Sequence, residues 1–244
     1  MLYHWRGCPE SIEYVRTLSS IVTAETRDYY QDVVVCVGGD GTLLQAIRTC
    51  TNLTRFLPIN LGTRGYLMNR ATPAKDLAEA INQKLLHAYQ FPRLHDGHRC
   101  ALNEIAVVPA ADQSVKLHVS IDGVPVSSEP VIGSGVLVAT GAGSTGWNMA
   151  AGGSARHALS ADLSLTFINA YSPRVPPMVV PFDSRITVTP HERNKRPART
   201  RIDGVSQPRT HEQVFHIDLS GTPVEILYMP DHNFTRRMIA KVIR

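Results

Sequence analysis

The pattern of hydrophobic and polar positions divides the chain into two parts. Residues 33–37, VVVCV, form a wholly apolar run that predicts a buried strand, and residues 55–60, RFLPIN, predict a second one. Between them, residues 42–50 carry apolar side chains at helical spacing. Residues 72–88, TPAKDLAEAINQKLLHA, predict a helix that begins with a Thr cap and a Pro at the first position. This alternation predicts a parallel sheet with helices on its faces.

After about residue 90 the pattern changes to short alternating runs separated by Gly, Pro and Asp. Residues 116–126, KLHVSIDGVPV, alternate around Asp122-Gly123, which is a hairpin signal. Further short strands are predicted at 135–140 (GVLVAT), 163–170 (LSLTFINA), 178–190 (MVVPFDSRITVTP), 201–205 (RIDGV) and 213–219 (QVFHIDL). The final stretch, NFTRRMIAKVIR, has the pattern of a helix.

These patterns predict a fold of two domains. Residues 1–92 are expected to form an N-terminal α/β domain, and residues 93–220 a mostly antiparallel β domain. Residues 221–244 are expected to pack back on the N-terminal domain. A chain of 244 residues is long enough for this arrangement, with a hydrophobic core in each part.

Composition is typical of a soluble globular protein, with 43% hydrophobic and 19% charged residues. No apolar stretch reaches the length that crosses a bilayer, and the first residues lack the layout of a secretion signal. The four cysteines lie far apart and form no CxxC pair, as expected in a reducing compartment. We therefore expect a cytoplasmic protein that does not associate with membranes.

The net charge of +4 and the pI of about 9.0 fit either a nucleic-acid partner or a site for phosphate-rich small molecules. The densest basic run, HERNKRPARTR at 191–201, has no interleaved aromatic residues, and the other basic residues form no stripe. This run is better explained as a solvated loop. We expect no nucleic-acid partner.

The chemically informative stretch is Gly-Gly-Asp-Gly, residues 38–41, between the first strand and the following helix. Glycines let the backbone approach a ligand closely, and a helix N-terminus presents N–H groups to phosphate. Asp40 would repel phosphate, unless it takes a proton from an attacking hydroxyl or holds Mg²⁺, both of which belong to phosphoryl transfer. The structural alternative is that Asp40 only caps the helix at Thr42 or Leu43.

The sequence resembles the NAD kinase family within the GGDGT superfamily, which also holds phosphofructokinases and lipid kinases. Four stretches carry the resemblance: GGDGT at 38–42, INLGTRGYL at 59–67, ALNEIAV at 101–107 and GVLVATGAGSTGWNMAAGG at 135–153. Their order and spacing match from about residue 33 onward. In the lipid kinases an Asn-Glu pair follows GGDGT almost at once, whereas here Asn103-Glu104 lies about sixty residues later.

The resemblance implies transfer of the terminal phosphate of ATP, or of polyphosphate, to the 2′-hydroxyl of the adenosine ribose of NAD. Asp40 would be the catalytic base, with Mg²⁺ accompanying ATP rather than held at a fixed protein site. The positions expected to bind nucleotide or NAD are Gly39, Gly41, Thr42, Asn103, Glu104, Ser134, Thr140, Gly141, Ala142, Ser144, Thr145, Trp147, Ala150 and Asp203. The resemblance also implies a homodimer or homotetramer.

Four positions depart from the family pattern. An acidic residue of the family corresponds to Ser134, a tyrosine to Trp147, a serine to Ala150 and a glutamine to Val205. Arg64 replaces a residue that is more often apolar, and is either a phosphate contact or an exposed loop arginine. These departures leave open a kinase for a lipid or another nucleoside hydroxyl, or a non-catalytic nucleotide sensor.

A second constellation, HDGHRC at 95–100, places two histidines and a cysteine within six residues. It lacks a convincing fourth ligand, so histidines on a surface strand are the better interpretation.

Overall fold

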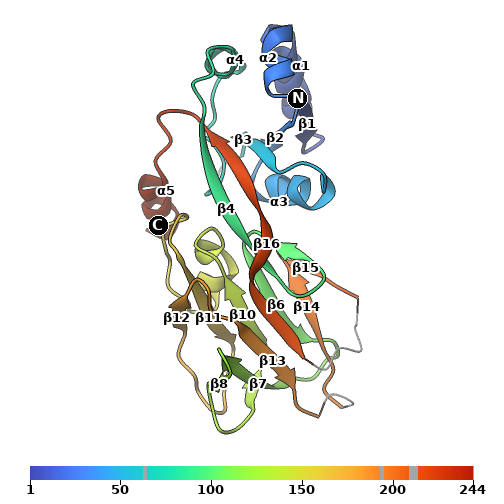
Figure 1. Ribbon diagram of the computed structural model, residues 1–244, viewed down its shortest axis with the longest axis vertical. Helices are drawn as coiled ribbons and strands as arrows, with labels where there is room; N and C mark the ends of the chain where they lie inside the picture. Colours follow the sequence, from blue (N-terminus) through green and yellow to red (C-terminus); the bar gives the residue numbers. More distant parts are fainter. Residues whose placement is uncertain (63–64, 193–194, 209–213, 244) are drawn as a thin grey trace. The chain divides into compact units, whose positions relative to one another are not determined.

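In a computed structural model, the chain folds into two units (Figure 1). The structure describes residues 1–62, 65–192, 195–208 and 214–243. The first unit combines residues 1–91 with 223–244, and the second consists of residues 92–222. The domain bounds 1–92, 93–220 and 221–244 remain a prediction of how the chain divides into domains.

The first unit is built on a parallel sheet. Strand β2 (Val33–Gly38) lies between β1 (Leu2–Trp5) and β3 (Arg55–Asn60), and the end of β16 (Phe215–Tyr228) pairs with β3 in parallel. All residues of β2 are buried, as expected for a strand covered on both faces. The predicted strands at 33–37 and 55–60 are therefore confirmed.

Helices cover this parallel sheet. The core on one face joins the sheet to α1 (Pro9–Ile21) and α4 (Ala74–Asn82), through Leu18 and Leu77 among others. The short α2 (Ala24–Tyr29) precedes β2, and α3 (Asp40–Thr49) buries Leu43, Ala46 and Ile47. The last helix, α5 (Phe234–Val242), carries the basic C-terminal stretch.

The helix predicted over 72–88 is shorter than expected. It ends at Asn82, because Lys84 adopts a left-handed conformation with φ of 57°, which an α-helix cannot continue through. The chain then enters β4 (His87–His95), so His87 and Ala88 belong to a strand. Apolar spacing alone did not reveal this break, because Leu85 fits the helical stripe but is 46% exposed.

The second unit is a sandwich of mostly antiparallel sheets. One sheet has the order β12 (Met178–Pro181), β11 (Asp162–Ile168), β10 (Gly135–Ala139), β6 (Glu104–Pro109), β14 (Ala198–Ile202), β15 (Val205–Ser206). In the other sheet, the start of β16 pairs with β13 (Ile186–Pro190), and β13 pairs with β7 (Val115–Ile121). Strand β7 also pairs with β8 (Val124–Pro125) and β9 (Val131–Gly133). The short β5 (Cys100–Ala101) pairs with β4. Inward residues of both sheets share one apolar core.

Two tight turns in this unit have the predicted chemistry. Asp122 and Gly123 both have positive φ, 51° and 82°, between paired strands β7 and β8, so the predicted hairpin is confirmed. Asp203 and Gly204 likewise have φ of 46° and 77°, between β14 and β15. The expected fold class, an α/β part and a mostly antiparallel β part, is also confirmed.

Candidate functional site

The GGDG loop joins the end of β2 to the start of α3 in the first unit. The hydroxyl of Thr42 accepts a hydrogen bond from the Gly39 N–H at 3.4 Å, and Thr42 N–H donates to the Gly39 carbonyl at 2.8 Å. A Cβ at Gly38 would lie 2.9 Å from the Cβ of Thr42, so only glycine allows this closure. Gly41 is exposed with nothing within 4 Å of where its Cβ would stand, which leaves open space at the N-terminus of α3.

Asp40 does not cap its own helix. Its carboxylate accepts hydrogen bonds from the backbone N–H groups of Tyr66, at 2.9 Å, and Leu67, at 3.1 Å. The alternative of a plain helix cap at Thr42 or Leu43 is therefore wrong, because both of those N–H groups bond to the Gly39 carbonyl instead. Two N–H donors leave the carboxylate with further lone pairs, and its side chain is 25% exposed.

Helix α5 brings two cations to the same loop, and no motif in the sequence marks either of them. The Lys241 Nζ lies 3.9 Å from Oδ2 of Asp40. Arg237 Nη1 donates to the Gly65 carbonyl at 2.7 Å, next to the amides that Asp40 holds. Burial lowers the pKa of Arg237, and the nearby Asp40 carboxylate opposes this. The signal in the sequence was the basic stretch TRRMIAK, which the helical pattern marked only as a packing element.

In the second unit, Asp203 organises the Asn-Glu motif. Its carboxylate accepts from the backbone N–H groups of Leu102 at 3.0 Å, Asn103 at 2.8 Å and Glu104 at 3.3 Å. Glu104 is buried, and its pKa is raised to about 7 by burial first and by the Asp203 carboxylate second. The Asp-Gly turn therefore does more than reverse the chain: it fixes the start of β6.

The Asn103 segment lies against the glycine-rich loop. Thr140 donates its hydroxyl proton to the Leu102 carbonyl at 2.7 Å. A Cβ on Gly143 would lie 2.6 Å from the carbonyl carbon of Asn103, so the loop and this backbone are in direct contact. Oδ1 of Asn103 is buried and has no hydrogen-bond partner among the described residues. Because buried polar atoms are normally hydrogen-bonded, this oxygen is a candidate acceptor for a hydroxyl or N–H group of a ligand.

The hydroxyl of Ser144 serves the loop itself. It lies fully buried at the start of a short irregular helical turn, η1 (Ser144–Asn148). It accepts from Arg156 N–H at 2.9 Å and is within donating distance of the carbonyls of Gly141, at 2.8 Å, and Arg156, at 3.0 Å. Ala142 and Thr145 are buried beside it. The Ser144 hydroxyl is therefore already bonded within the protein.

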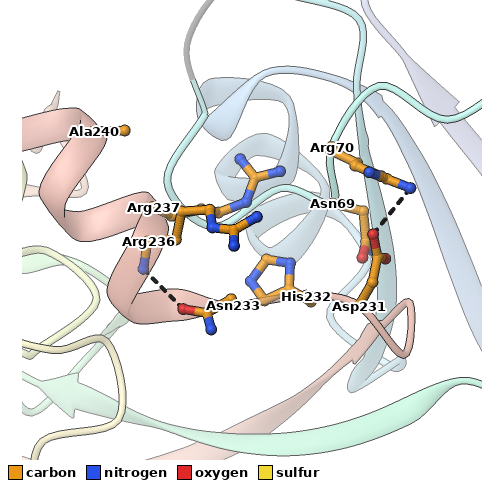
Figure 2. A pocket seen from close by; sticks show the side chains of 8 residues that line it. All are labelled: Asn69, Arg70, Asp231, His232, Asn233, Arg236, Arg237 and Ala240. Carbon is orange, nitrogen blue, oxygen red and sulfur yellow. Dashed lines mark hydrogen bonds and ion pairs between the residues drawn. The ribbon is translucent and has the colours of Figure 1, made fainter.

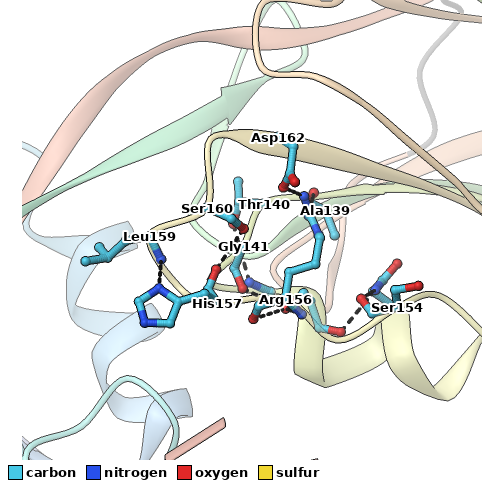
Figure 3. Close-up of polar contacts among 12 residues, drawn as sticks. Ala139, Thr140, Gly141, Ser154, Arg156, His157, Leu159, Ser160 and Asp162 are labelled. Carbon is cyan, nitrogen blue, oxygen red and sulfur yellow. Dashed lines mark hydrogen bonds and ion pairs between the residues drawn. The ribbon is translucent and has the colours of Figure 1, made fainter. Parts of the chain in front are cut away.

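Two buried side chains that the sequence analysis missed hold this loop. The Arg156 side chain extends to the Ala139 carbonyl, at 2.9 Å, and to the Asp162 carboxylate (Figure 3). Burial lowers its pKa to about 10. Asn148 donates to the carbonyls of Ser144 and Ser154, both at 3.0 Å. Neither residue stands in a recognisable short motif, so spacing gave no signal for them.

The departing positions lie at different places around the second unit's site residues. Ser134 accepts a long hydrogen bond, 3.4 Å, from Asn169, and Ala150 is exposed just after η1. The Cζ atom of Arg201 lies over the Trp147 ring, 5.2 Å from the ring centroid. Val205 is 40% exposed in β15. The expected contact of Arg64 lies outside the described residues.

The described residues were expected to hold no fixed metal site at HDGHRC. Within the described residues there is no group of three or more His, Cys, Asp or Glu side chains that could hold a metal ion. In HDGHRC, the Asp96 carboxylate instead accepts from the N–H groups of His98, at 3.1 Å, and Arg99, at 2.9 Å. No helix over the described ranges is long and apolar enough to span a membrane.

Comparison with known proteins shows the family to which the chain belongs. The family model of the ATP-NAD kinase N-terminal domain matches residues 9–89, and that of the ATP-NAD kinase C-terminal domain matches residues 102–227. The chain belongs to the ATP-NAD kinase family. It is 32% identical over 228 residues to an NAD kinase of Zymomonas mobilis, covering 87% of this chain and 86% of that one. An NAD kinase of Rickettsia bellii is 29% identical over 239 residues, covering 94% and 91%.

Solved structures agree on the fold. An NAD kinase from Archaeoglobus fulgidus in complex with ATP superposes with a TM-score of 0.79 at 23% identity, covering 99% of this chain and 97% of that one. Yeast NADH kinase complexed with NADH gives 0.75 at 22% identity, covering 87% of this chain and 65% of that one.

The family match confirms the activity expected from the sequence. The chain is an NAD kinase, an enzyme that phosphorylates NAD to NADP with ATP. The alternatives, a kinase for another hydroxyl and a non-catalytic sensor, are not favoured by these matches.

Proposed function

We propose that Asp40 is the base of this NAD kinase and that it accepts the proton of the ribose 2′-hydroxyl as that oxygen attacks the terminal phosphate of ATP. The observation that supports this role is the carboxylate at the N-terminus of α3, partly exposed and held by two backbone N–H donors. Such a carboxylate is oriented and still has lone pairs for a hydroxyl proton.

The phosphates of the donor are proposed to lie over the start of α3. The helix N-terminus favours negative charge, and Gly41 leaves space for phosphate oxygens. Lys241 and Arg237 offset the repulsion between Asp40 and phosphate, since their charges lie beside the carboxylate. This positioning and charge neutralisation accounts for most of the catalysis in phosphoryl transfer.

Mg²⁺ is proposed to enter with ATP. Asp40 is the carboxylate at this loop, and no cluster of acidic ligands forms within the described ranges. Bound to the donor, the ion would neutralise phosphate charge. The protein's own part is to orient the acceptor hydroxyl and remove its proton.

NAD is proposed to be held by the second unit's motif residues. Asn103 and Glu104 would take the ribose hydroxyls or the nicotinamide end, with Asp203 fixing their backbone. The glycine-rich loop, from Thr140 to Thr145, would contribute backbone N–H groups, because the Ser144 hydroxyl is already bonded within the protein. Ser134, Trp147 and Ala150 would adapt this site around the adenine and ribose.

A cytoplasmic location and a homodimer or homotetramer are further proposals, supported by the family resemblance. The use of polyphosphate in place of ATP is a proposal of the same kind.

The experiment that tests the function is a donor and acceptor panel with the purified chain. NAD, NADH, a nucleoside and a diacylglycerol would each be incubated with ATP and Mg²⁺, then NAD with polyphosphate, and the phosphorylated carbon located by phosphorus NMR. We expect a 2′-phosphate on NAD. Phosphorylation of the nucleoside or the lipid with NAD left unchanged would contradict the proposal.

A further inference from the structure

A pocket of about 240 Å³ opens in the first unit beside the start of α5 (Figure 2). The residues that line it are Asn69, Arg70, Asp231, His232, Asn233, Arg236, Arg237 and Ala240. No residue predicted from the motifs lines it. Three of its side chains are guanidinium groups and one is a carboxylate, so its lining is positively charged.

The guanidinium groups differ in how firmly they are engaged. Arg70 pairs with Asp231 at 3.0 Å, and both side chains are well exposed, at 72% and 49%. The Arg236 guanidinium is exposed and makes no ion pair with any residue that the structure describes. Only Arg237 is partly buried, and its bond to Gly65 uses one nitrogen of the fork. Donors of Arg236 and Arg70 are therefore available to a ligand.

The helix adds to the same field. Asn233 accepts from Arg236 N–H at 2.8 Å and so begins α5 at the pocket. The N-terminus of a helix carries a partial positive charge, which favours an anion there. Two independent features, the arginines and the helix start, thus favour the same sign of ligand charge.

His232 gives the pocket a fixed wall. Its ring lies 4.0 Å from that of Tyr228 and 4.4 Å from that of Phe234, measured between centroids. Burial, and next the charge of Arg237, lowers the pKa of His232 to about 4, so the ring is neutral at pH 7. The positive charge of the pocket therefore comes from its arginines and does not vary near neutral pH.

We propose that this pocket binds the phosphate groups of a di- or triphosphate. Planar guanidinium forks match the oxygens of phosphate and carboxylate groups in pairs, which excludes a halide as the better ligand. Three guanidinium groups against one carboxylate favour a ligand with several negative charges, such as a di- or triphosphate, over a single carboxylate. Its volume lies below the roughly 300–1,000 Å³ of pockets that enclose drug-sized ligands, so it has room for phosphates, and a nucleoside attached to them would lie outside it. On binding, Arg70 would turn from Asp231 to the ligand.

The test is calorimetric titration of the full chain with inorganic pyrophosphate at low salt, without NAD. The variants are Arg236→Gln, Arg70→Gln and Asp231→Asn, with Arg16→Gln, at an exposed position of α1, as the matched control. We expect binding to weaken at least tenfold in each of the first two, to tighten at least threefold in Asp231→Asn, and to stay within twofold in the control. Absence of binding in the unmodified chain, or unchanged binding in both arginine variants, would overturn the proposal.

A second arm distinguishes the source of the phosphates. The rate of NADP formation by Arg236→Gln at varied ATP concentration gives its KM for ATP. A rise of at least fivefold in this KM assigns the pocket to the phosphates of ATP. An unchanged KM, with pyrophosphate binding lost, assigns it to a free anion. The titration contains no NAD and leaves Asp40 intact, so failure of the role proposed for Asp40 would not alter its result.

Discussion

Replacement of Gly143 by alanine tests whether the glycine-rich loop needs its contact with Asn103. The ideal Cβ would lie 2.6 Å from the Asn103 carbonyl carbon, 2.7 Å from its Cα and still closer to its oxygen. Gly143 has φ of −83° and ψ of −9°, which alanine adopts without strain. The contact itself is therefore the whole effect.

The expected magnitude follows from what would have to move. All three atoms belong to backbone, so no side-chain rotamer relieves the contact. Opening the distance to the carbonyl carbon from 2.6 Å to the 3.0 Å limit needs about 0.4 Å, and the closer oxygen requires a larger shift. Overpacking of this kind costs about 1–3 kcal/mol in the free energy of unfolding. Because the start of β6 shifts as well, kcat/KM for NAD should fall by up to about 100-fold.

The assay uses the two tryptophans, Trp5 in the first unit and Trp147 in the second. In a Trp5→Phe background, the fluorescence of Trp147 reports the urea unfolding of the second unit. Trp147 lies four residues along the chain from Gly143. The glycine control is Gly41→Ala, monitored by circular dichroism. Since Gly41 lies in α3 with open space around it, alanine there should stabilise by about 0.4–1 kcal/mol. A Gly143→Ala chain that is as stable and as active as the unmodified one would refute the reasoning.

Three further substitutions have defined outcomes. Ser144→Ala removes the acceptor of Arg156 N–H and should cost about 1–3 kcal/mol in urea unfolding; a loss below about 0.5 kcal/mol would contradict the buried network. The pKa of Glu104 in the folded chain, about 7, lies above its ordinary 4.5, so stability should fall as pH rises between these values. Glu104→Gln should remove that slope, and a slope that persists would argue against this carboxyl as its cause. Arg237→Lys keeps the charge but loses the guanidinium nitrogen that donates to the Gly65 carbonyl, and kcat for NADP formation should drop about tenfold; an unchanged kcat would show that this bond is dispensable.

Much of the fold was predictable because its strands are short, apolar and bounded by glycine or turn residues. The strand at 55–60 and the hairpin at Asp122-Gly123 are examples, since pattern and turn chemistry agree there. The end of α4 was not predictable, because the break at Lys84 depends on a backbone conformation that lysine does not signal. Strand β1 was also missed, since its exposed Leu2 and Trp5 hide the alternation.

The site was predictable only where a motif names its residues. Asp40 and the Asn-Glu pair stand in such motifs, but their partners come from distant segments. Lys241 reaches Asp40 across two hundred residues of sequence, and Asp203 bonds to Asn103 across one hundred. Periodicity assigns such residues to a helix face or a turn, and only the three-dimensional structure shows which atoms they meet.

The role of Asp40 as base is tested most directly by the turnover of Asp40→Asn with NAD, ATP and Mg²⁺, with the dissociation constant for NAD measured alongside. Because Asp40 also holds the amides of Tyr66 and Leu67, Arg237→Lys, which loses the bond to the neighbouring Gly65 carbonyl and leaves Asp40 intact, serves as the comparison. We predict that kcat of Asp40→Asn falls by about 10²–10⁴, well beyond the loss in Arg237→Lys, while NAD binding stays within threefold. Turnover within tenfold of the unmodified chain, or a loss no larger than that of Arg237→Lys, would contradict the account.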